Sequence, residues 1–250
     1  MNRLWSRLVR AGESLLAATA EICAYCGQRV KHYPQRSFRL CGKCYAEIPW
    51  IETIGCQTCG RGEPCPDCER RGPSPLLLNR SAVKYDPKMK EWLAAYKFRR
   101  NERLNVLFVE MLHQTYRRHL SGYFPNGRPD AVTFVPVSAA RLEERGFNQA
   151  EQLARGVAER LGIPLVPLLK RVRDTEKQSR KTRAERLKDL RDVFALEDQA
   201  LKRLLKNGMP EPINIIIIDD VYTTGSTLHA CAETIARHMQ AHLYGLTWAR

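Results

Sequence analysis

The sequence predicts an α/β protein whose core is a parallel sheet, preceded by a double four-cysteine metal-binding module. From residue 76 onward, continuous apolar segments alternate with amphipathic segments, which is typical of a parallel sheet with helices on both faces. Before that point, eight of the nine cysteines fall into four CxxC pairs. The 250 residues are enough for one domain of ordinary size and a small additional module.

Residues 1–20 predict a short N-terminal helix. Leu4, Trp5 and Leu8 are spaced to share one face, which we expect to pack on the rest of the protein. The longest apolar run is short and Glu13 interrupts the region, so we expect neither a signal peptide nor a transmembrane segment. We therefore expect a cytoplasmic protein, with any contact to the inner face of the membrane made through partners. The formal net charge of +14 favours anionic partners, such as nucleic acid or nucleotides.

Residues 21–72 predict a zinc-binding double ribbon. A CxxC turn presents two sulfur atoms to one ion, and two such turns complete a tetrahedral thiolate site. The simplest partition is sequential, with one site formed by Cys23, Cys26, Cys41 and Cys44 and the other by Cys56, Cys59, Cys65 and Cys68. A cross-braced partition and an iron–sulfur cluster are the alternatives. Because so short a segment buries little apolar area, we expect the two zinc ions to be structural.

Residues 76–250 predict the α/β domain, which follows the linker Arg70 to Pro75. Strands are predicted over 76–85, 131–137, 165–169, 213–218 and 242–248, and helices over 88–98, 102–120, 149–161 and from the end of the fourth strand to about 240. Asn148 and Glu151 have the spacing of a capping box at the start of the third helix. In sheets of this kind, ligands bind at the carboxyl ends of the strands.

The segment IIIIDDVYTTGST, residues 215–227, predicts a buried strand, an acidic loop and the start of a helix. Backbone N–H groups of residues 223–227 would point at an anion, and Gly225 permits its close approach. Asp219 and Asp220 would repel a phosphate, so they suit a ribose diol or a magnesium ion. A Walker B strand would require a GxxxxGK[ST] loop, which the sequence lacks. A ligand with a sugar diol and a phosphate satisfies both halves of the segment.

Two basic clusters are candidates for contact with nucleic acid. Residues 170–191 hold ten Lys or Arg between two predicted strands, where such a segment can close over a ligand or track a phosphate backbone. A second cluster lies beside Tyr96 and Phe98, and a single-strand platform needs both charge and aromatic rings. A solvated charged helix face is the alternative. The candidate DNA-binding residues are Arg99, Arg100, Arg103, Lys177, Arg180, Lys181 and Arg183.

Segment 215–227 resembles the phosphoribosyl-diphosphate (PRPP) motif of type I phosphoribosyltransferases. The four CxxC pairs, AAYKFRR, VPVSAARLEERGFNQAEQLA, RVRDTEKQSRKTRAER and the closing LTWAR occur in the order typical of the ComF family. The resemblance covers nearly the whole chain, and GFNQAE is its most specific part after the PRPP motif. It implies a parallel sheet of the type I phosphoribosyltransferase kind and binding of PRPP with magnesium.

The resemblance also implies roles for individual residues. Asp219 and Asp220 would contact the ribose hydroxyls, and residues 223–227 the 5′-phosphate. Ser138 matches the position of the diphosphate loop, and Arg141 and Arg145 are charge partners for the diphosphate. The candidate PRPP-binding residues are Lys97, Ser138, Arg141, Arg145, Asp219, Asp220, Thr223, Thr224, Gly225, Ser226 and Thr227. Type I phosphoribosyltransferases carry a small hood over the sheet, and Lys97 would contact an anion from that side. No catalytic residue can be named.

The resemblance implies a protein of natural transformation that takes part in DNA uptake. Such a protein would receive incoming single-stranded DNA in the cytoplasm, bind PRPP with magnesium, and work with a helicase-like ATPase of the same system. The alternative is an active phosphoribosyltransferase that transfers the phosphoribosyl group of PRPP to an unknown nucleophile and releases pyrophosphate. The sequence identifies neither an acceptor pocket nor an acid or base dedicated to an acceptor.

Overall fold

The computed structural model describes residues 21–31, 33–99, 102–173, 193–206 and 211–250. The chain divides into two compact units, Met1–Ile48 and Pro49–Arg250. The two four-cysteine clusters, which we expected in one module over 21–72, therefore belong to different units. The helix predicted over 1–20 lies outside the described residues.

The first unit is built around two tight turns. An antiparallel bridge joins Ile22 and Arg29 across the first CxxC turn. The regular elements are the 3-10 helix η1 (Arg36–Phe38) and helix α2 (Gly42–Ala46), which begins inside the second CxxC pair. Leu40 is fully buried, so apolar side chains and cysteines together form the small interior.

The second unit alternates strands and helices. Its strands are β1 (Leu76–Val83), β2 (Ala131–Phe134), β3 (Leu169–Arg171), β4 (Phe194–Leu196), β5 (Ile213–Val221) and β6 (Ala241–Ala249). Its α-helices are α3 (Pro66–Glu69), α4 (Pro87–Arg99), α5 (Glu102–His119), α6 (Ala139–Arg145), α7 (Gln149–Leu161), α9 (Asp198–Lys206) and α10 (Ser226–Ala236). Two 3-10 helices, η2 (Ser121–Tyr123) and η3 (Pro125–Gly127), follow α5.

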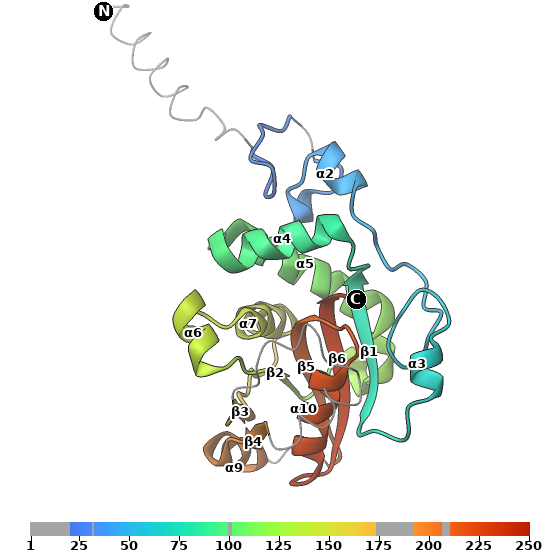
Figure 1. Ribbon diagram of the computed structural model, residues 1–250, viewed down its shortest axis with the longest axis vertical. Coiled ribbons are helices and arrows are strands. Elements are labelled where there is room, and N and C mark those ends of the chain that lie inside the picture. The colour runs from blue at the N-terminus through green and yellow to red at the C-terminus, as the bar shows by residue number, and fades with distance from the viewer. Residues whose placement is uncertain (1–20, 32, 100–101, 174–192, 207–210) are drawn as a thin grey trace, which may run out of the picture. The chain divides into compact units, whose positions relative to one another are not determined.

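Four strands form a parallel sheet in the order β1-β6-β5-β2 (Figure 1). Ile215 to Ile218 are all fully buried, and because successive strand residues point to opposite faces, both faces of β5 are covered. Helices α5 and α7 pack against the sheet and against each other, and α10 packs against β1, β5 and β6. The predicted parallel α/β core is therefore confirmed.

Aromatic packing fixes α4 and α5 relative to the sheet. Phe108 of α5 stacks on Trp248 of β6 with 4.0 Å between the ring centroids. Tyr96 of α4 meets Phe108 edge-on, and its hydroxyl donates a hydrogen bond to Gln152 Oε1 of α7 at 3.0 Å. These contacts determine where the next residue of α4, Lys97, stands.

Strand β5 is longer than the sequence predicts. Asp219 and Asp220 were expected in a loop, but they belong to the end of β5, which continues to Val221. The reason is non-local: β6 extends equally far, and Asp219 is the register partner of Thr247. Helix α10 also differs from its prediction, because it ends at Ala236 rather than near residue 240.

Strands β3 and β4 pair to form a small antiparallel sheet. One strand lies at each end of the basic segment, residues 170–191. The strand predicted over 165–169 corresponds to a bridge at Leu165 and to the start of β3. Arg171, the last residue of β3, is the register partner of Phe194. Residues 174–191 of the basic segment lie outside the described residues.

Candidate functional site

The eight paired cysteines gather into two clusters in the sequential partition. We call Cys23, Cys26, Cys41 and Cys44 the first cluster, and Cys56, Cys59, Cys65 and Cys68 the second cluster. Within each cluster, all sulfur atoms lie within 4.8 Å of one another. Four thiolates at this spacing suit one tetrahedral Zn²⁺ and leave no ligand position for water, so each cluster can hold a structural zinc ion. The cross-braced partition is not formed.

The second cluster is attached to the edge strand β1. The Asn79 N–H donates to Thr58 O at 2.7 Å, and the Asn79 side-chain amide donates to Cys59 O at 3.3 Å. The buried guanidinium of Arg80 donates to Gln57 O at 2.8 Å. A Cβ atom on Gly60, which has a φ of +74°, would lie 2.5 Å from Asn79 O. The first CxxC turn of this cluster, Cys56 to Cys59, therefore packs closely against β1 of the sheet.

A cavity of about 180 Å³ opens at the carboxyl ends of β2 and β5. Its walls come from the ends of these strands and from the nearby ends of α4, α6, α7, β3 and α10. The lining residues are Lys97, Val135, Pro136, Val137, Arg141, Arg145, Asn148, Gln149, Ala150, Arg171, Asp219, Asp220, Val221 and Thr227. Four cationic side chains thus face two carboxyl groups, and this excess of positive charge suits an anionic ligand.

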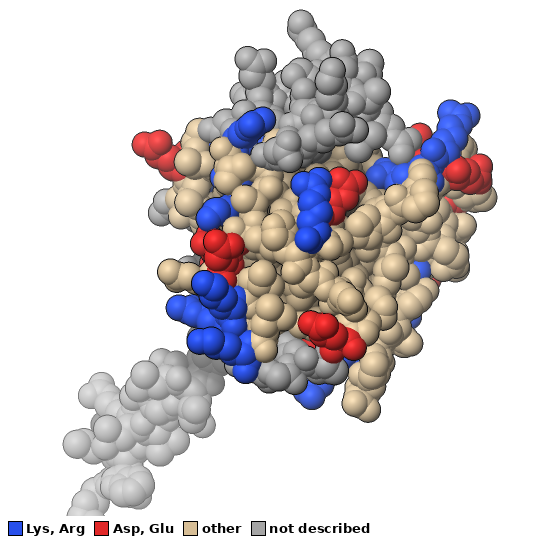
Figure 2. All heavy atoms as spheres, turned by 90° about the horizontal axis from the view of Figure 1, so that it is seen from below, with Lys and Arg blue, Asp and Glu red and all other residues tan. Residues whose placement is uncertain are grey.

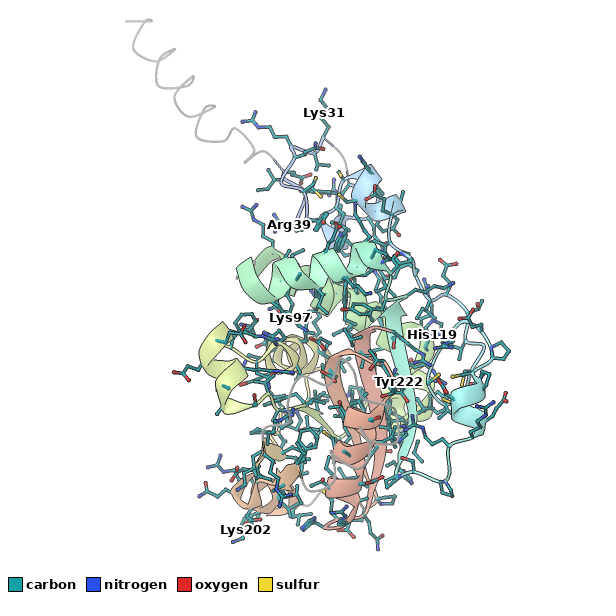
Figure 3. All side chains as sticks on the ribbon, viewed as in Figure 1. Lys31, Arg39, Lys97, His119, Lys202 and Tyr222 are labelled. Carbon is teal, nitrogen blue, oxygen red and sulfur yellow. The ribbon has the colours of Figure 1, made fainter. Side chains whose placement is uncertain are left out.

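Lys97 and Asp220 form an ion pair in the lining of the cavity, and their side chains are only 19% and 17% exposed. Figure 3 shows Lys97 on the side of α4 that faces the sheet. Burial acts to raise the pKa of Asp220, but the Lys97 ammonium, the Val221 N–H and the charge of Arg145 together hold that pKa below its usual range. For Asp219, burial and the charge of Asp220 raise the pKa well above its ordinary value. The pKa values of the two neighbouring carboxyl groups are therefore shifted in opposite directions.

The turn at residues 223–227 joins β5 to α10. Gly225 caps the helix with a φ of +76°, and a Cβ atom there would lie 2.1 Å from the Tyr222 hydroxyl oxygen. Glycine is therefore needed both for its dihedral angle and for its lack of a side chain. The hydroxyl oxygens of Thr224 and Ser226 lie 2.8 Å apart, and Thr227 lines the cavity. An eleven-residue helix thus begins at the cavity, with its N–H groups at that end.

Helices α6 and α7 begin next to the end of β2. Ser138 caps α6 by accepting a hydrogen bond from the Arg141 N–H. Asn148 caps α7 by accepting from the Ala150 N–H at 3.0 Å, and its Nδ2 donates to Val135 O at 3.1 Å. This side chain ties the start of α7 to the strand end that forms the cavity wall.

Gln149 also faces the cavity, and its side chain is almost fully buried at 2% exposure. Its Oε1 accepts a hydrogen bond from Arg145 Nη1 at 2.8 Å. Its Nε2 has no hydrogen-bond partner within the described part of the chain. A buried amide without a partner, on a residue that lines a cavity, is suited to an oxygen atom of a ligand.

The structure brings together six of the predicted PRPP-binding residues as lining of one cavity, namely Lys97, Arg141, Arg145, Asp219, Asp220 and Thr227. Ser138, Thr223, Thr224, Gly225 and Ser226 lie next to these residues in the chain without lining the cavity. Asn148, Gln149 and Arg171 were not predicted as site residues, although GFNQAE was recognised as a specific segment. From the sequence, Asn148 of that segment is interpreted only as a helix cap.

Most of the predicted DNA-binding residues lie outside the residues that the structure describes. Arg100, Lys177, Arg180, Lys181 and Arg183 lie outside the described residues. Arg99 ends α4, and Arg103 is exposed in the first turn of α5. Figure 2 shows a face on which Lys and Arg stand in separate groups with Asp and Glu between them. On that face, the described residues form no continuous basic stripe.

Similar proteins were found among curated sequences. Competence protein ComFC of Bacillus subtilis is 35% identical over 206 residues, which cover 79% of this chain and 78% of that protein. Competence protein F of Haemophilus influenzae is 27% identical, covering 95% of this chain and 93% of its own. DNA utilization protein YhgH of Escherichia coli is 26% identical, covering 80% and 85%.

Solved structures with some likeness include adenine phosphoribosyltransferases. The Saccharomyces cerevisiae enzyme has a TM-score of 0.33 at 22% identity, covering 57% of this chain and 68% of that chain. The Leishmania tarentolae enzyme has a TM-score of 0.34 at 16% identity, covering 60% and 58%. These scores are low, and no family model matches the sequence.

Among the described helices, none is long and apolar enough to cross a membrane. On the strength of its sequence relatives, the chain belongs to the ComFC family of competence proteins.

Proposed function

We propose that this protein binds PRPP with magnesium in the cavity at the ends of β2 and β5, and that it does so as a single-stranded DNA-binding protein of natural transformation. The observation that carries the proposal is the combination of Asp219 and Asp220 with the N-terminus of α10 at one cavity. A diol and a phosphate on one ligand would meet both groups at once.

The two aspartates are suited to different atoms of a ribose. Asp220 stays ionised beside Lys97 and can accept hydrogen bonds from hydroxyl groups. Asp219, with its raised pKa, keeps its proton over a wider pH range and can donate one. The turn at 223–227 would receive the 5′-phosphate through its N–H and hydroxyl groups.

The diphosphate would lie toward α6 and α7. Arg141, Arg145 and Gln149 line that side of the cavity. The carboxylate oxygens of Asp220, which stays ionised, are ligands that Mg²⁺ accepts, and the ion would offset the charge of the diphosphate. Guanidinium groups bind phosphate oxygens in pairs, which fixes the orientation of the group.

The ligand-binding test uses calorimetry with PRPP and magnesium. The unmodified protein is expected to bind, and Asp219→Asn combined with Asp220→Asn is expected to weaken binding about 100-fold or more, since two hydrogen bonds to charged or buried groups are lost. Glu233→Gln, on the exposed face of α10, removes a carboxylate away from the cavity and serves as the control. Equal binding by the double variant and the control would refute the site.

Membership of a competence family supports the DNA-binding half of the proposal. Curated relatives are called competence proteins or DNA utilization proteins. Incoming single-stranded DNA is a polyanion, and the chain carries a net charge of +14. We propose that the protein acts in the cytoplasm and receives this strand together with a helicase-like ATPase of the same system.

The DNA-binding test measures affinity for single-stranded DNA over a range of salt concentrations. Replacing Arg99, Arg100 and Arg103 with Ala is expected to weaken binding and to reduce the slope of log K against log salt by about 2, because each lost phosphate contact contributes about 0.7. The control replaces Lys202, Arg203 and Lys206 of α9, which removes the same charge elsewhere. Loss of affinity to the same extent in both variants would exclude a specific role for Arg99, Arg100 and Arg103.

The second candidate function is transfer of the phosphoribosyl group to a nucleophile. Arg141 and Arg145 favour it, because guanidinium groups that bind a diphosphate also stabilise it as it leaves. A pyrophosphate-release assay with PRPP and candidate acceptors, single-stranded DNA among them, separates binding from turnover. Release that depends on an acceptor and is lost with Arg145→Ala would establish the enzyme; PRPP binding without release under any condition would establish a binding protein.

A further inference from the structure

Two guanidinium groups hold the backbone of the 223–227 turn. Arg71 Nη2 donates a hydrogen bond to Thr224 O. Arg250 Nη1 donates to Thr223 O at 3.2 Å, and its guanidinium lies over the Tyr222 ring, 4.9 Å from the centroid. Two successive carbonyl groups of the turn are therefore held by cationic side chains.

Both arginines are connected to the second cluster. Arg250 Nη2 donates a hydrogen bond to Cys65 Sγ at 3.5 Å. The Arg71 N–H donates to Cys68 O at 3.1 Å, immediately after helix α3. Each arginine thus joins one cysteine of the second cluster to one carbonyl of the turn, Arg250 through its guanidinium alone and Arg71 through its backbone N–H and its guanidinium.

A third connection runs from the same segment to α10. Ser74 Oγ lies 2.5 Å from His229 Nδ1, and His229 Nε2 lies 3.3 Å from the Tyr222 hydroxyl oxygen. His229 is buried at 3% exposure. The chain that leaves the second cluster is therefore attached to both the first turn of α10 and the end of β5.

Peptide geometry gives these contacts a direction. In a trans peptide, the C=O of one residue and the N–H of the next point in opposite directions. With Thr223 O and Thr224 O held by Arg250 and Arg71, the N–H groups of Thr224 and Gly225 point away from the arginines. A phosphate bound by the turn needs these N–H groups aimed at it in advance, since orienting them on binding would cost affinity.

We infer that Arg71 and Arg250 are positioning residues for the 223–227 turn, and that the second cluster, through Cys65 and Cys68, determines how well the turn binds a 5′-phosphate. This inference rests on the proposed function of the cavity. Neither arginine is among the described residues that line the cavity, and both contact the turn through its backbone carbonyl groups, so we assign them an action through the backbone.

The second cluster can fix these contacts only when its sulfur atoms are held together. A Zn²⁺ bound by its four thiolates would keep Cys65 and Cys68 in place, and thiolate ligands without metal repel one another or take up protons. The first cluster belongs to the other compact unit, and no such role is assigned to it. The two clusters are therefore expected to differ in their influence on ligand binding.

The test of the arginines compares Arg71→Ala and Arg250→Ala with Arg70→Ala, an exposed neighbour that removes the same charge. Calorimetry uses ribose 5-phosphate and inorganic pyrophosphate as separate probes. Arg71→Ala and Arg250→Ala are expected to bind ribose 5-phosphate at least about tenfold more weakly, the effect of one lost charge-assisted hydrogen bond, with pyrophosphate affinity unchanged. Faster amide exchange at residues 223–227 is expected in both variants without any ligand.

The test of the cluster compares Cys68→Ser with Cys41→Ser, two partly exposed cysteines of the second and first clusters. Zinc content is measured on both. Each variant is expected to lose about one zinc ion per chain. The affinity for ribose 5-phosphate is expected to be about tenfold weaker in Cys68→Ser than in Cys41→Ser.

The outcomes separate the inference from the proposed function. If the unmodified protein binds neither probe, the proposed function fails, and the amide-exchange comparison with Arg70→Ala still decides whether the arginines hold the turn. If the protein binds both probes and the three arginine variants bind ribose 5-phosphate equally, the positioning role is wrong. Weakened pyrophosphate binding in step with ribose 5-phosphate binding would also overturn it, because it would indicate general loss of structure.

Discussion

Asp219 and Asp220 are adjacent in the chain, yet their surroundings give their carboxyl groups opposite pKa shifts. Burial and the charge of Asp220 raise the pKa of Asp219, whereas the ammonium of Lys97 lowers that of Asp220. Pairs of acids whose pKa values are driven apart occur where a site needs one donor and one acceptor. The sequence predicts the pair, but it does not predict the asymmetry, because Lys97 reaches the pair only through the packing of α4.

The raised pKa of Asp219 predicts a pH-dependent change in stability. As pH rises from the ordinary value of 3.8 to the raised folded-state value, the unfolded chain releases the Asp219 proton while the folded protein still holds it, so the free energy of unfolding falls. Asp219→Asn removes this loss, so its stability relative to the unmodified protein is expected to increase with pH, by about 1.4 kcal/mol for each unit of pKa shift. Urea unfolding at a series of pH values measures this difference.

The amide of the variant can still accept the Asp220 N–H bond that Asp219 Oδ1 accepts at 2.8 Å. Glu233→Gln, an exposed acid on α10, provides the matched control and is expected to change the pH profile little. Parallel pH profiles for Asp219→Asn and the unmodified protein would contradict a raised pKa.

At the scale of elements, the sequence predicts helices and strands that depend on local signals. It does not predict features that depend on contacts with residues distant in the chain. Helix α7 was predicted over 149–161 as observed, because its apolar period and its Asn148 cap are both local. The extension of β5 to Val221 depends on β6, which lies later in the chain, so no local pattern contains it. Arg171 reaches the cavity through the β3–β4 hairpin, which is again a non-local contact.

The turn between β5 and α10 predicts a position-specific effect of added bulk. Gly225→Ala adds a Cβ atom 2.1 Å from the Tyr222 hydroxyl oxygen in a left-handed conformation. We expect about 1–3 kcal/mol lower stability and a loss of ribose 5-phosphate binding, because the turn has to move. Thermal unfolding and calorimetry measure the two effects.

Gly127→Ala separates the clash from the dihedral angle. Gly127 has a similar φ of +66°, but a Cβ atom there would meet nothing within 4 Å. This control is expected to cost about 1 kcal/mol and to leave ligand binding unchanged. The prediction for Gly225 would be refuted by equal effects of the two substitutions on binding.

At the scale of the whole molecule, the two clusters divide between the compact units. The first cluster has few buried apolar side chains around it, so we expect its stability to depend on a bound metal ion. The second is fastened to β1 by Asn79 and Arg80 as well. The CxxC spacing predicted both sites, whereas only tertiary contacts reveal that one of them belongs with the sheet.

Metal content tests both clusters together. Purified protein is expected to contain about two zinc ions per chain, since each cluster offers four thiolates. A strong chelator is expected to unfold the first unit before the sheet, because binding free energy is folding free energy in small metal-stapled units. Elemental analysis that finds iron and no zinc, with visible absorbance, would contradict the assignment.

The buried Nε2 of Gln149 has a consequence for which molecules the cavity excludes. In the unbound protein this buried donor has no partner within the described residues, so a ligand that offers it a hydrogen-bond acceptor gains about 1–3 kcal/mol and a ligand without one gains nothing. That gain corresponds to roughly 10- to 100-fold in affinity. Gln149 therefore favours oxygen-rich ligands over apolar molecules, however well the apolar molecules would fit the available volume.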